Sequence, residues 1–159
     1  KRMVEWALQE TDMTAFADRP VEALSGGQRQ RAWIAMAIAQ DTEILFLDEP
    51  TSFLDVAHQM DVLTLVRHLN TAYGKTIVMV IHEINEAARF ADYLLAMRHG
   101  TLLYEGTPDE VFTREMLADV FGIDAELLRD PRTGRPYCIP YVNRERPAGS
   151  ASKEEKAYA

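Results

Sequence analysis

The sequence has few of the features that identify a class of protein directly. It contains a single cysteine, Cys138, in 159 residues, which excludes an internal disulfide framework and fits a reducing compartment. No apolar run approaches the roughly 18 residues needed to span a bilayer, and there are no internal repeats. Lys and Arg are too few for a basic face: the net charge of −8 argues against nonspecific attraction to nucleic acid or anionic lipid. We therefore expect a soluble, cytoplasmic domain that does not bind nucleic acid.

The beginning of the chain also lacks familiar signals. No apolar stretch precedes the first helical pattern, so a signal peptide is not expected. Because the first residue is Lys1 and not methionine, we expect the 159 residues to be a fragment. Apolar residues make up 47% and charged residues 26%, as in soluble globular proteins of one domain.

Hydrophobic spacing predicts alternating strands and helices. Helical spacing indicates helices over 1–17, 26–40, 56–73 and 83–90. Short apolar runs indicate buried strands over 44–47 and 76–81, and a hairpin signal joins strands over 93–97 and 101–105. Two or three short helices are expected within 107–128, and a disordered tail over 143–159. This alternation predicts an α/β fold with a parallel sheet flanked by helices.

Chemistry-bearing residues follow the two predicted central strands. Asp48 and Glu49 come directly after the first strand, and His82 after the second. Ligands of parallel α/β sheets bind beyond the carboxyl ends of the strands. An adjacent acid pair can divide labour, one carboxylate holding a hydrated Mg²⁺ and the other orienting or deprotonating a water. The two acids are equally compatible with a cap on the next helix.

A glycine-rich turn, Leu24-Ser25-Gly26-Gly27-Gln28, precedes the helix over 26–40. Its glycines allow a ligand to approach the backbone, and the first N–H groups of a helix attract anions. Taken alone, the turn is more typical of a plain helix cap.

Together these segments resemble a known family. In order, the runs LSGGQRQR, ILFLDEPTSFLD and Ile81-His82 resemble the second half of the nucleotide-binding domain of ABC transporters. Residues 24–28 match the signature motif of that family, 44–49 the Walker B strand and 52–55 the D-loop, while His82 matches the switch histidine. The resemblance covers 1–142 and implies a partial P-loop NTPase domain. It divides into a helical signature subdomain over 1–40, a core over 41–106, and C-terminal helices with an extension over 107–142.

The resemblance implies roles for individual residues in an ATPase that uses ATP and Mg²⁺. It implies that Asp48 organises the water shell of Mg²⁺, that Glu49 is the general base, and that His82 contacts the γ-phosphate. The signature residues and the D-loop aspartate would lie against ATP held by a second subunit in a head-to-tail homodimer; they are Ser25, Gly26, Gly27, Gln28 and Asp55. His58, by contrast, is expected to be a solvated surface residue.

Departures from the family pattern limit what this chain can do. The sequence contains no G-x-x-x-x-G-K-[ST], the Walker A loop that cradles phosphate, so we expect the isolated chain to be inactive as an ATPase. The adenine-stacking aromatic and the Q-loop glutamine of the family would lie upstream of Lys1. Without neighbouring strands, the strand over 44–47 would be an exposed edge, and we expect oligomerisation or aggregation.

Further segments resemble the subfamily that imports iron–siderophores and related metal chelates or cobalamin: 52–70, 80–100, 105–113 and 120–140. The resemblance implies a subunit on the cytoplasmic face of the membrane, below two transmembrane permease subunits and served by an extracytoplasmic substrate-binding protein. Two alternatives remain open. One is a truncated, non-catalytic dimerisation module. The other is a DNA-maintenance ATPase of the same superfamily, although this chain shows no sustained heptads.

Overall fold

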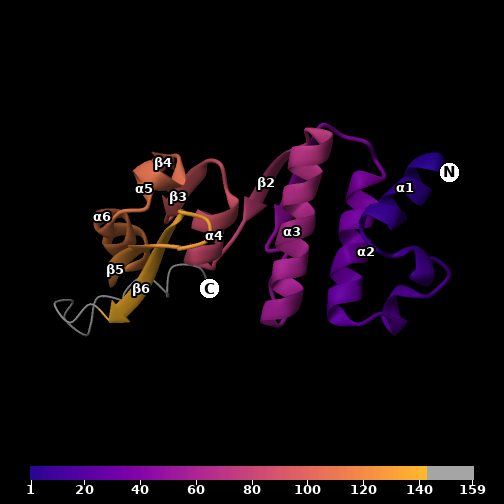
Figure 1. Ribbon diagram of the computed structural model, residues 1–159, viewed down its shortest axis with the longest axis horizontal. Coiled ribbons are helices and arrows are strands. Elements are labelled where there is room, and N and C mark those ends of the chain that lie inside the picture. The colour runs from indigo at the N-terminus through magenta and orange to yellow at the C-terminus, as the bar shows by residue number, and fades with distance from the viewer. Residues whose placement is uncertain (143–159) are drawn as a thin grey trace. The chain divides into compact units, whose positions relative to one another are not determined.

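The computed structural model describes residues 1–142, which form two compact units (Figure 1). The first unit ends at His82 and the second begins at Glu83. This boundary lies inside the segment 41–106 that the sequence analysis treats as one core. The predicted tail, 143–159, lies outside the described residues.

Helices and one pair of strands make up the first unit. Its elements are α1 (Arg2–Glu10), η1 (Thr14–Phe16), η2 (Val21–Ala23), α2 (Gly26–Ile38), β1 (Ile44–Asp48), α3 (Val56–Tyr73) and β2 (Thr76–Val80). The predicted helix over 1–17 is too long: α1 ends at Glu10, and Asp12 has a φ of 56°, which a continuing helix does not allow. Helix α3 ends as predicted, because Gly74 adopts the left-handed conformation that closes a helix.

The two strands of the first unit pair in parallel, as predicted. Leu45 lies opposite Ile77, and Leu47 opposite Met79. Paired residues of a sheet share a face, and this face packs against the helices. The core beneath it combines buried residues of four elements: Ala7 of α1; Ile34, Ala35 and Ile38 of α2; Leu45 of β1; and Val62, Val66 and Leu69 of α3.

The opposite face of the β1–β2 pair is bare within the described residues. It carries Ile44, Phe46, Val78 and Val80, and Phe46 is 76% exposed. The sequence prediction that both strands are buried is therefore wrong for every second residue. A continuous apolar run is suited to burial on both faces, and residues 1–142 cover only one of them.

Short helices and two antiparallel hairpins make up the second unit. Its elements are α4 (Ile84–Phe90), β3 (Leu94–Arg98), β4 (Thr101–Gly106), α5 (Pro108–Val111), α6 (Arg114–Met116), η3 (Leu117–Phe121), β5 (Ile123–Arg129) and β6 (Pro136–Val142). The predicted β3–β4 hairpin is confirmed. Its two turn residues, His99 and Gly100, both have positive φ, as the favoured two-residue hairpin turn requires.

The β5–β6 hairpin corrects the sequence analysis. Helices were expected up to residue 128 and none of 107–142 was expected to be strand, yet β5 and β6 pair along their whole length. Ala125 and Cys138 of this hairpin are buried in the core of the second unit. The side chain of Asn85 on α4 secures the hairpin: its Oδ1 accepts from the Cys138 N–H at 2.8 Å, and its Nδ2 donates to the Cys138 carbonyl at 3.1 Å.

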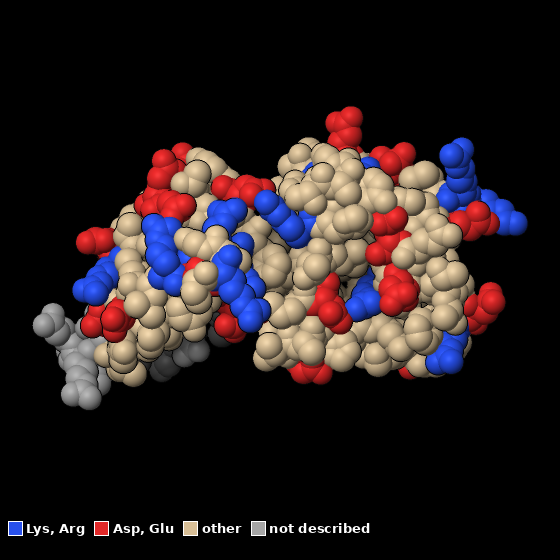
Figure 2. All heavy atoms as spheres, in the orientation of Figure 1, with Lys and Arg blue, Asp and Glu red and all other residues tan. Residues whose placement is uncertain are grey.

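Charged side chains of both signs lie close together on the second unit (Figure 2). Ion pairs join Arg129 to Asp109, Arg89 to Asp130, and Arg135 to Asp92. These pairs are exposed or partly exposed, so each contributes little to stability. None of the helices formed by residues 1–142 is long and apolar enough to cross a membrane.

Candidate functional site

A tight loop joins β1 to α3 and carries most of the predicted chemistry. It opens with Glu49, whose carbonyl accepts from the Ser52 N–H at 3.1 Å. Both Glu49 (φ 46°) and Phe53 (φ 63°) adopt the left-handed conformation that side-chain-bearing residues normally avoid. Gln59 of α3 holds the end of the loop, because its Nε2 donates to the Leu54 carbonyl at 3.1 Å. The loop is thus held in a strained conformation by bonds at both ends.

Glu49 and His82 meet beyond the carboxyl ends of the two parallel strands. Oε1 of Glu49 lies 2.6 Å from Nε2 of His82, and Oε2 accepts from the Ser52 hydroxyl at 2.7 Å. The strand pairing explains the meeting: Asp48, just before Glu49, lies opposite Val80, two residues before His82. Both side chains remain open to solvent, with His82 69% and Glu49 42% exposed. A carboxylate and an imidazole are therefore presented together at an accessible edge.

Hydrogen bonds hold Glu49 in its charged form. The Ser52 hydroxyl, followed by the His82 ring, lowers the pKa of the Glu49 carboxyl below its usual value. Donors that bind the carboxylate favour ionisation. Glu49 is therefore an acceptor at neutral pH, able to orient a water molecule or take a proton from it.

Asp48 is the last residue of β1, and its carboxylate is exposed. Within residues 1–142 no cluster of three or more His, Cys, Asp or Glu residues could hold a metal ion. A site built by protein ligands alone is therefore not formed by the described residues. Mg²⁺ commonly retains several waters and binds one or two carboxylates together with phosphate oxygens, so a single exposed aspartate is compatible with it.

The glycine-rich turn forms the N-terminus of α2 and is capped by its own side chains. Ser25 is the cap residue: its hydroxyl oxygen accepts from the Gln28 N–H at 3.3 Å, and Gln28 Oε1 accepts from the Ser25 N–H at 3.1 Å. This reciprocal pair is a capping box. The interpretation of the turn as a helix cap is thus confirmed, and the cap leaves further hydrogen-bond donors free to bind a ligand. The Ser25 hydroxyl hydrogen can still donate, and the first-turn N–H groups have no intrahelical acceptor.

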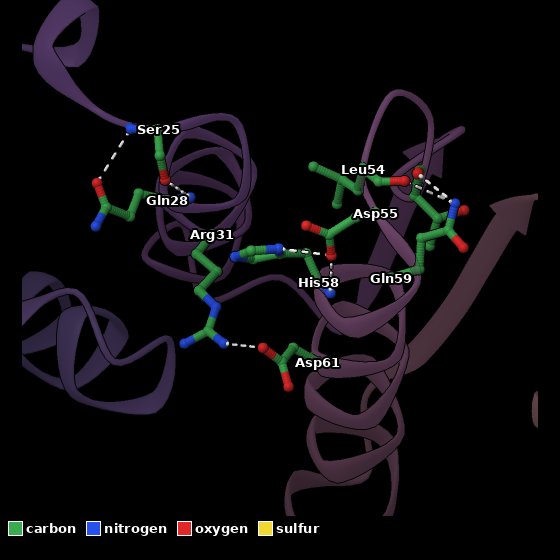
Figure 3. A network of polar contacts seen from close by, with 9 residues as sticks. Ser25, Gln28, Arg31, Leu54, Asp55, His58, Gln59 and Asp61 are labelled. Carbon is green, nitrogen blue, oxygen red and sulfur yellow. Dashed lines mark hydrogen bonds and ion pairs between the residues drawn. The ribbon is translucent and has the colours of Figure 1, made fainter.

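The N-terminus of α3 lies beside this turn, and Asp55 and His58 lie at the contact (Figure 3). Asp55 caps α3, with Oδ1 accepting from the His58 N–H at 3.0 Å and lying 2.8 Å from His58 Nδ1. The backbone N–H of His58, then its ring, lowers the pKa of the Asp55 carboxyl. The His58 ring also lies against Gly27. This role of His58 was not predicted from the sequence; the spacing Asp55-x-x-His58, that of an N-cap residue and the N3 residue of its helix, could have indicated it.

An ion pair one turn further along joins the same two helices. Nη2 of Arg31 on α2 lies 2.9 Å from Oδ2 of Asp61 on α3 (Figure 3). Arg31 therefore pairs with a carboxylate of the neighbouring helix.

The predicted site residues therefore form two groups within the first unit. One joins Glu49 and His82 next to Asp48, and the other joins Ser25, Gly26, Gly27, Gln28 and Asp55. No hydrogen bond or ion pair links the two groups in the described part of the chain. They are connected by the loop between Glu49 and Asp55.

Comparison with known proteins decides the family. Residues 1–52 match the family model described as ABC transporter. Over 141 residues the chain is 57% identical to the iron(3+)-hydroxamate import ATP-binding protein FhuC of Bacillus subtilis, covering 89% of this chain and 52% of the relative. The chain belongs to the ABC transporter family. It is also 49% identical, over 150 residues, to the achromobactin transport ATP-binding protein CbrD of Dickeya dadantii, covering 94% of this chain and 55% of that one.

Solved structures of ABC proteins share its fold. One is a metal-chelate type ABC transporter in an inward-facing conformation, with a TM-score of 0.81, 30% identity, and coverage of 89% of this chain and 57% of that one. Another is the dimeric ATP-binding cassette MJ0796 bound to ADP and Pi, with a TM-score of 0.59, 34% identity, and coverage of 67% and 46%. The α/β ABC ATPase fold predicted from the sequence is confirmed. The chain spans about half the length of the curated relatives it matches.

Proposed function

We propose that this chain is part of the ATP-hydrolysing subunit of a bacterial ABC importer for iron–siderophores or related metal chelates. The contact that carries the proposal is Glu49 held between Ser52 and His82, beyond the ends of two parallel strands. The cargo class rests on the names of the relatives, which include import proteins for iron hydroxamate and achromobactin.

Glu49 and His82 would carry the hydrolytic step. We infer that the Glu49 carboxylate orients the attacking water and accepts its proton. His82, 2.6 Å away, would contact the γ-phosphate and adjust the position of Glu49 according to the nucleotide present. A step of this kind consists largely of positioning and electrostatic stabilisation, which suits a short, strained loop held at both ends.

Asp48 is the residue that would hold Mg²⁺, through waters of its shell. Its place beside Glu49 at the end of β1 and its exposed carboxylate fit that role. When bound, Mg²⁺ would neutralise charge on the β- and γ-phosphate oxygens of ATP.

The turn at the start of α2 would bind the γ-phosphate of an ATP held by a second subunit. Its donors are the Ser25 hydroxyl and the N–H groups of Gly26 and Gly27, with Gln28 fixing the turn through the capping box. Asp55 would lie at the same seam. A head-to-tail homodimer of this kind closes on ATP and opens after hydrolysis, and the dimeric cassette MJ0796 with ADP and Pi supports it.

Further partners follow from the same reading. The pair would lie on the cytoplasmic face of the membrane, below transmembrane permease subunits, and would be served indirectly by an extracytoplasmic substrate-binding protein. The names of the relatives as import or transport ATP-binding proteins support these assignments.

Association with an ATP-loaded relative tests the proposal. The 159-residue chain is titrated into B. subtilis FhuC with and without Mg-ATP, and association is measured by sedimentation velocity. We expect association only with ATP. Ser25→Asp should weaken it tenfold or more, because aspartate still caps α2 while its charge repels phosphate.

Thr113→Asp is the matched control, because the Thr113 hydroxyl caps α6 by accepting from the Met116 N–H at 3.1 Å, as Ser25 caps α2. It should leave the ATP-dependent association unchanged. Association that is equal with and without ATP, or that Ser25→Asp does not weaken, would contradict the proposal.

Hydrolysis by the isolated chain is a separate measurement. Because the sequence has no G-x-x-x-x-G-K-[ST], we expect no steady release of phosphate from Mg-ATP. Steady hydrolysis that Glu49→Gln abolishes would show this expectation to be wrong. An inactive chain that still associates with ATP-loaded FhuC would act as a dimerisation module in isolation.

A further inference from the structure

The His58 ring lies at the contact between the N-termini of α2 and α3. We propose that His58 is a positioning residue, which fixes the Asp55 carboxylate and the glycine turn of α2 relative to each other. The effect of this positioning on ATP-dependent association rests on the function proposed above. The contacts that carry it all lie within the first unit.

The first contact is steric. A Cβ built on Gly27 would lie 2.4 Å from Cδ2 of the His58 ring, nearer than real Cβ atoms come to such a neighbour, and 3.1 Å from its Cγ. Gly26, by contrast, would meet only Leu54 Cδ2 at an ordinary 3.8 Å. A side chain at Gly27 would therefore force the His58 ring out of its position, whether or not a ligand is bound.

The second contact is polar. Oδ1 of Asp55 accepts from the His58 backbone N–H at 3.0 Å and from the ring Nδ1 at 2.8 Å. The backbone bond alone satisfies the helix cap, so the ring bond is additional: it fixes the direction of the carboxylate. The same ring that contacts Gly27 thus also orients Asp55 (Figure 3).

The His58 side chain therefore positions two groups, the Asp55 carboxylate and the glycine turn of α2. In the proposed head-to-tail dimer, this chain would present both groups to its partner. If the ring moves, the orientation of Asp55 and the shape of the turn change together. The buried core that α2 and α3 share, with Ile34 and Ile38 beside Val62 and Val66, keeps the two helices packed when His58 is replaced.

Three replacements separate the functions of the ring. His58→Asn keeps an N–H donor at the position of Nδ1 and places its amide oxygen near the position of Cδ2, whereas His58→Ala removes both. His58→Phe keeps a ring and removes the donor. His68 is the matched control, because it lies on the same helix, is similarly exposed, and also meets a carboxylate, that of Glu10, at 3.2 Å.

The first measurement is the ATP-dependent association with FhuC, together with urea unfolding of each variant. We expect His58→Phe to weaken association about three- to tenfold, through loss of a charge-assisted hydrogen bond. His58→Asn should restore most of it, and His68→Phe should not change it. A purely structural role would instead shift the urea midpoint and leave association unchanged, and this result would overturn the proposal.

The second measurement needs no nucleotide, so it tests the proposal for His58 independently of the function proposed above. Gly27→Ala is made in the parent chain and in His58→Ala, and the urea midpoints are compared. We expect a lower midpoint in the parent and little change or a rise in His58→Ala, where the ring is gone. Equal effects in both backgrounds would overturn the steric contact. If FhuC shows no ATP-dependent association, the proposed function fails and this comparison alone decides the placement of His58.

Discussion

The β1–β2 pair and the β5–β6 hairpin each expose one face, and the two exposed faces carry different residues. In β1–β2, the exposed face is apolar, with Ile44 and Phe46 beside Val78 and Val80. In β5–β6, the exposed face mixes acids with apolar residues and tyrosines: Asp124 lies opposite Tyr141, Glu126 opposite Ile139, and Leu128 opposite Tyr137. The second pattern is typical of a sheet with one face in water, and the first of a sheet covered on both. The β1–β2 pair therefore has a surface suited to a further layer that residues 1–142 do not supply.

The largest expected effect lies on the covered face of β1. Leu45 is 3% exposed and packs between α2 and α3. Leu45→Ala should lower the free energy of unfolding of the first unit by about 2–5 kcal/mol, through lost burial and a cavity. Tryptophan fluorescence in urea measures this unit selectively, because both tryptophans, Trp6 and Trp33, belong to it. A cost below about 1 kcal/mol would contradict the described core.

A smaller effect is expected where α4 holds the β5–β6 hairpin. Asn85→Ala leaves the N–H and carbonyl of Cys138 without their side-chain partner, which costs about 1–3 kcal/mol. Cys138 is the sole cysteine and is fully buried, so its reaction rate with a thiol reagent measures opening of the hairpin. We expect the rate to rise roughly 5- to 100-fold.

Asn70→Ala is the control for that experiment. Asn70 donates to the Lys75 carbonyl at 2.9 Å in the first unit, so its loss removes a similar bond elsewhere. The labelling rate of Cys138 should then stay at the parental value. A rise of equal size in both variants would mean that the hairpin opens only with the whole chain.

The smallest effect on stability is expected on the bare face of β1. Phe46 is mostly exposed, so Phe46→Ser should change the free energy of unfolding by less than about 0.5 kcal/mol. It should nevertheless reduce concentration-dependent self-association, which exposed apolar strands promote. Light scattering over a dilution series checks this, with Tyr137→Ser on the exposed face of β6 as the matched comparison. If the parent chain is monomeric at every concentration, the exposed face of β1 does not promote self-association and the prediction is wrong.

The elements that could be predicted were those whose signals are local. Helix α3 has a regular apolar spacing and ends at Gly74, and the His99-Gly100 turn specifies the β3–β4 hairpin. The β5 strand was missed because Ala125, Glu126 and Leu127 favour helices, and pairing with β6 overrides that preference. A hairpin signal was present in the turn, where Asp130 accepts from the Arg132 and Thr133 N–H groups.

For the candidate site, the residue types and their order were predictable, and so was one contact, whereas another was not. Glu49 and His82 follow neighbouring parallel strands, so the sheet brings them together whatever the helices do. The contact of His58 with Gly27 depends on how α2 packs on α3, and this is set by side chains spread along both helices. No local pattern carries that information.

The left-handed backbone at Glu49 and Phe53 has a consequence for anyone who seeks a more stable form of this protein. Phe53 is fully exposed with a φ of 63°, a conformation that glycine adopts without penalty. Phe53→Gly is therefore a candidate for relieving strain, but a relaxed loop would hold the Glu49 carboxylate less firmly beside His82. At position 53, glycine would then favour thermal stability and phenylalanine would favour turnover, as is common where strain accompanies activity.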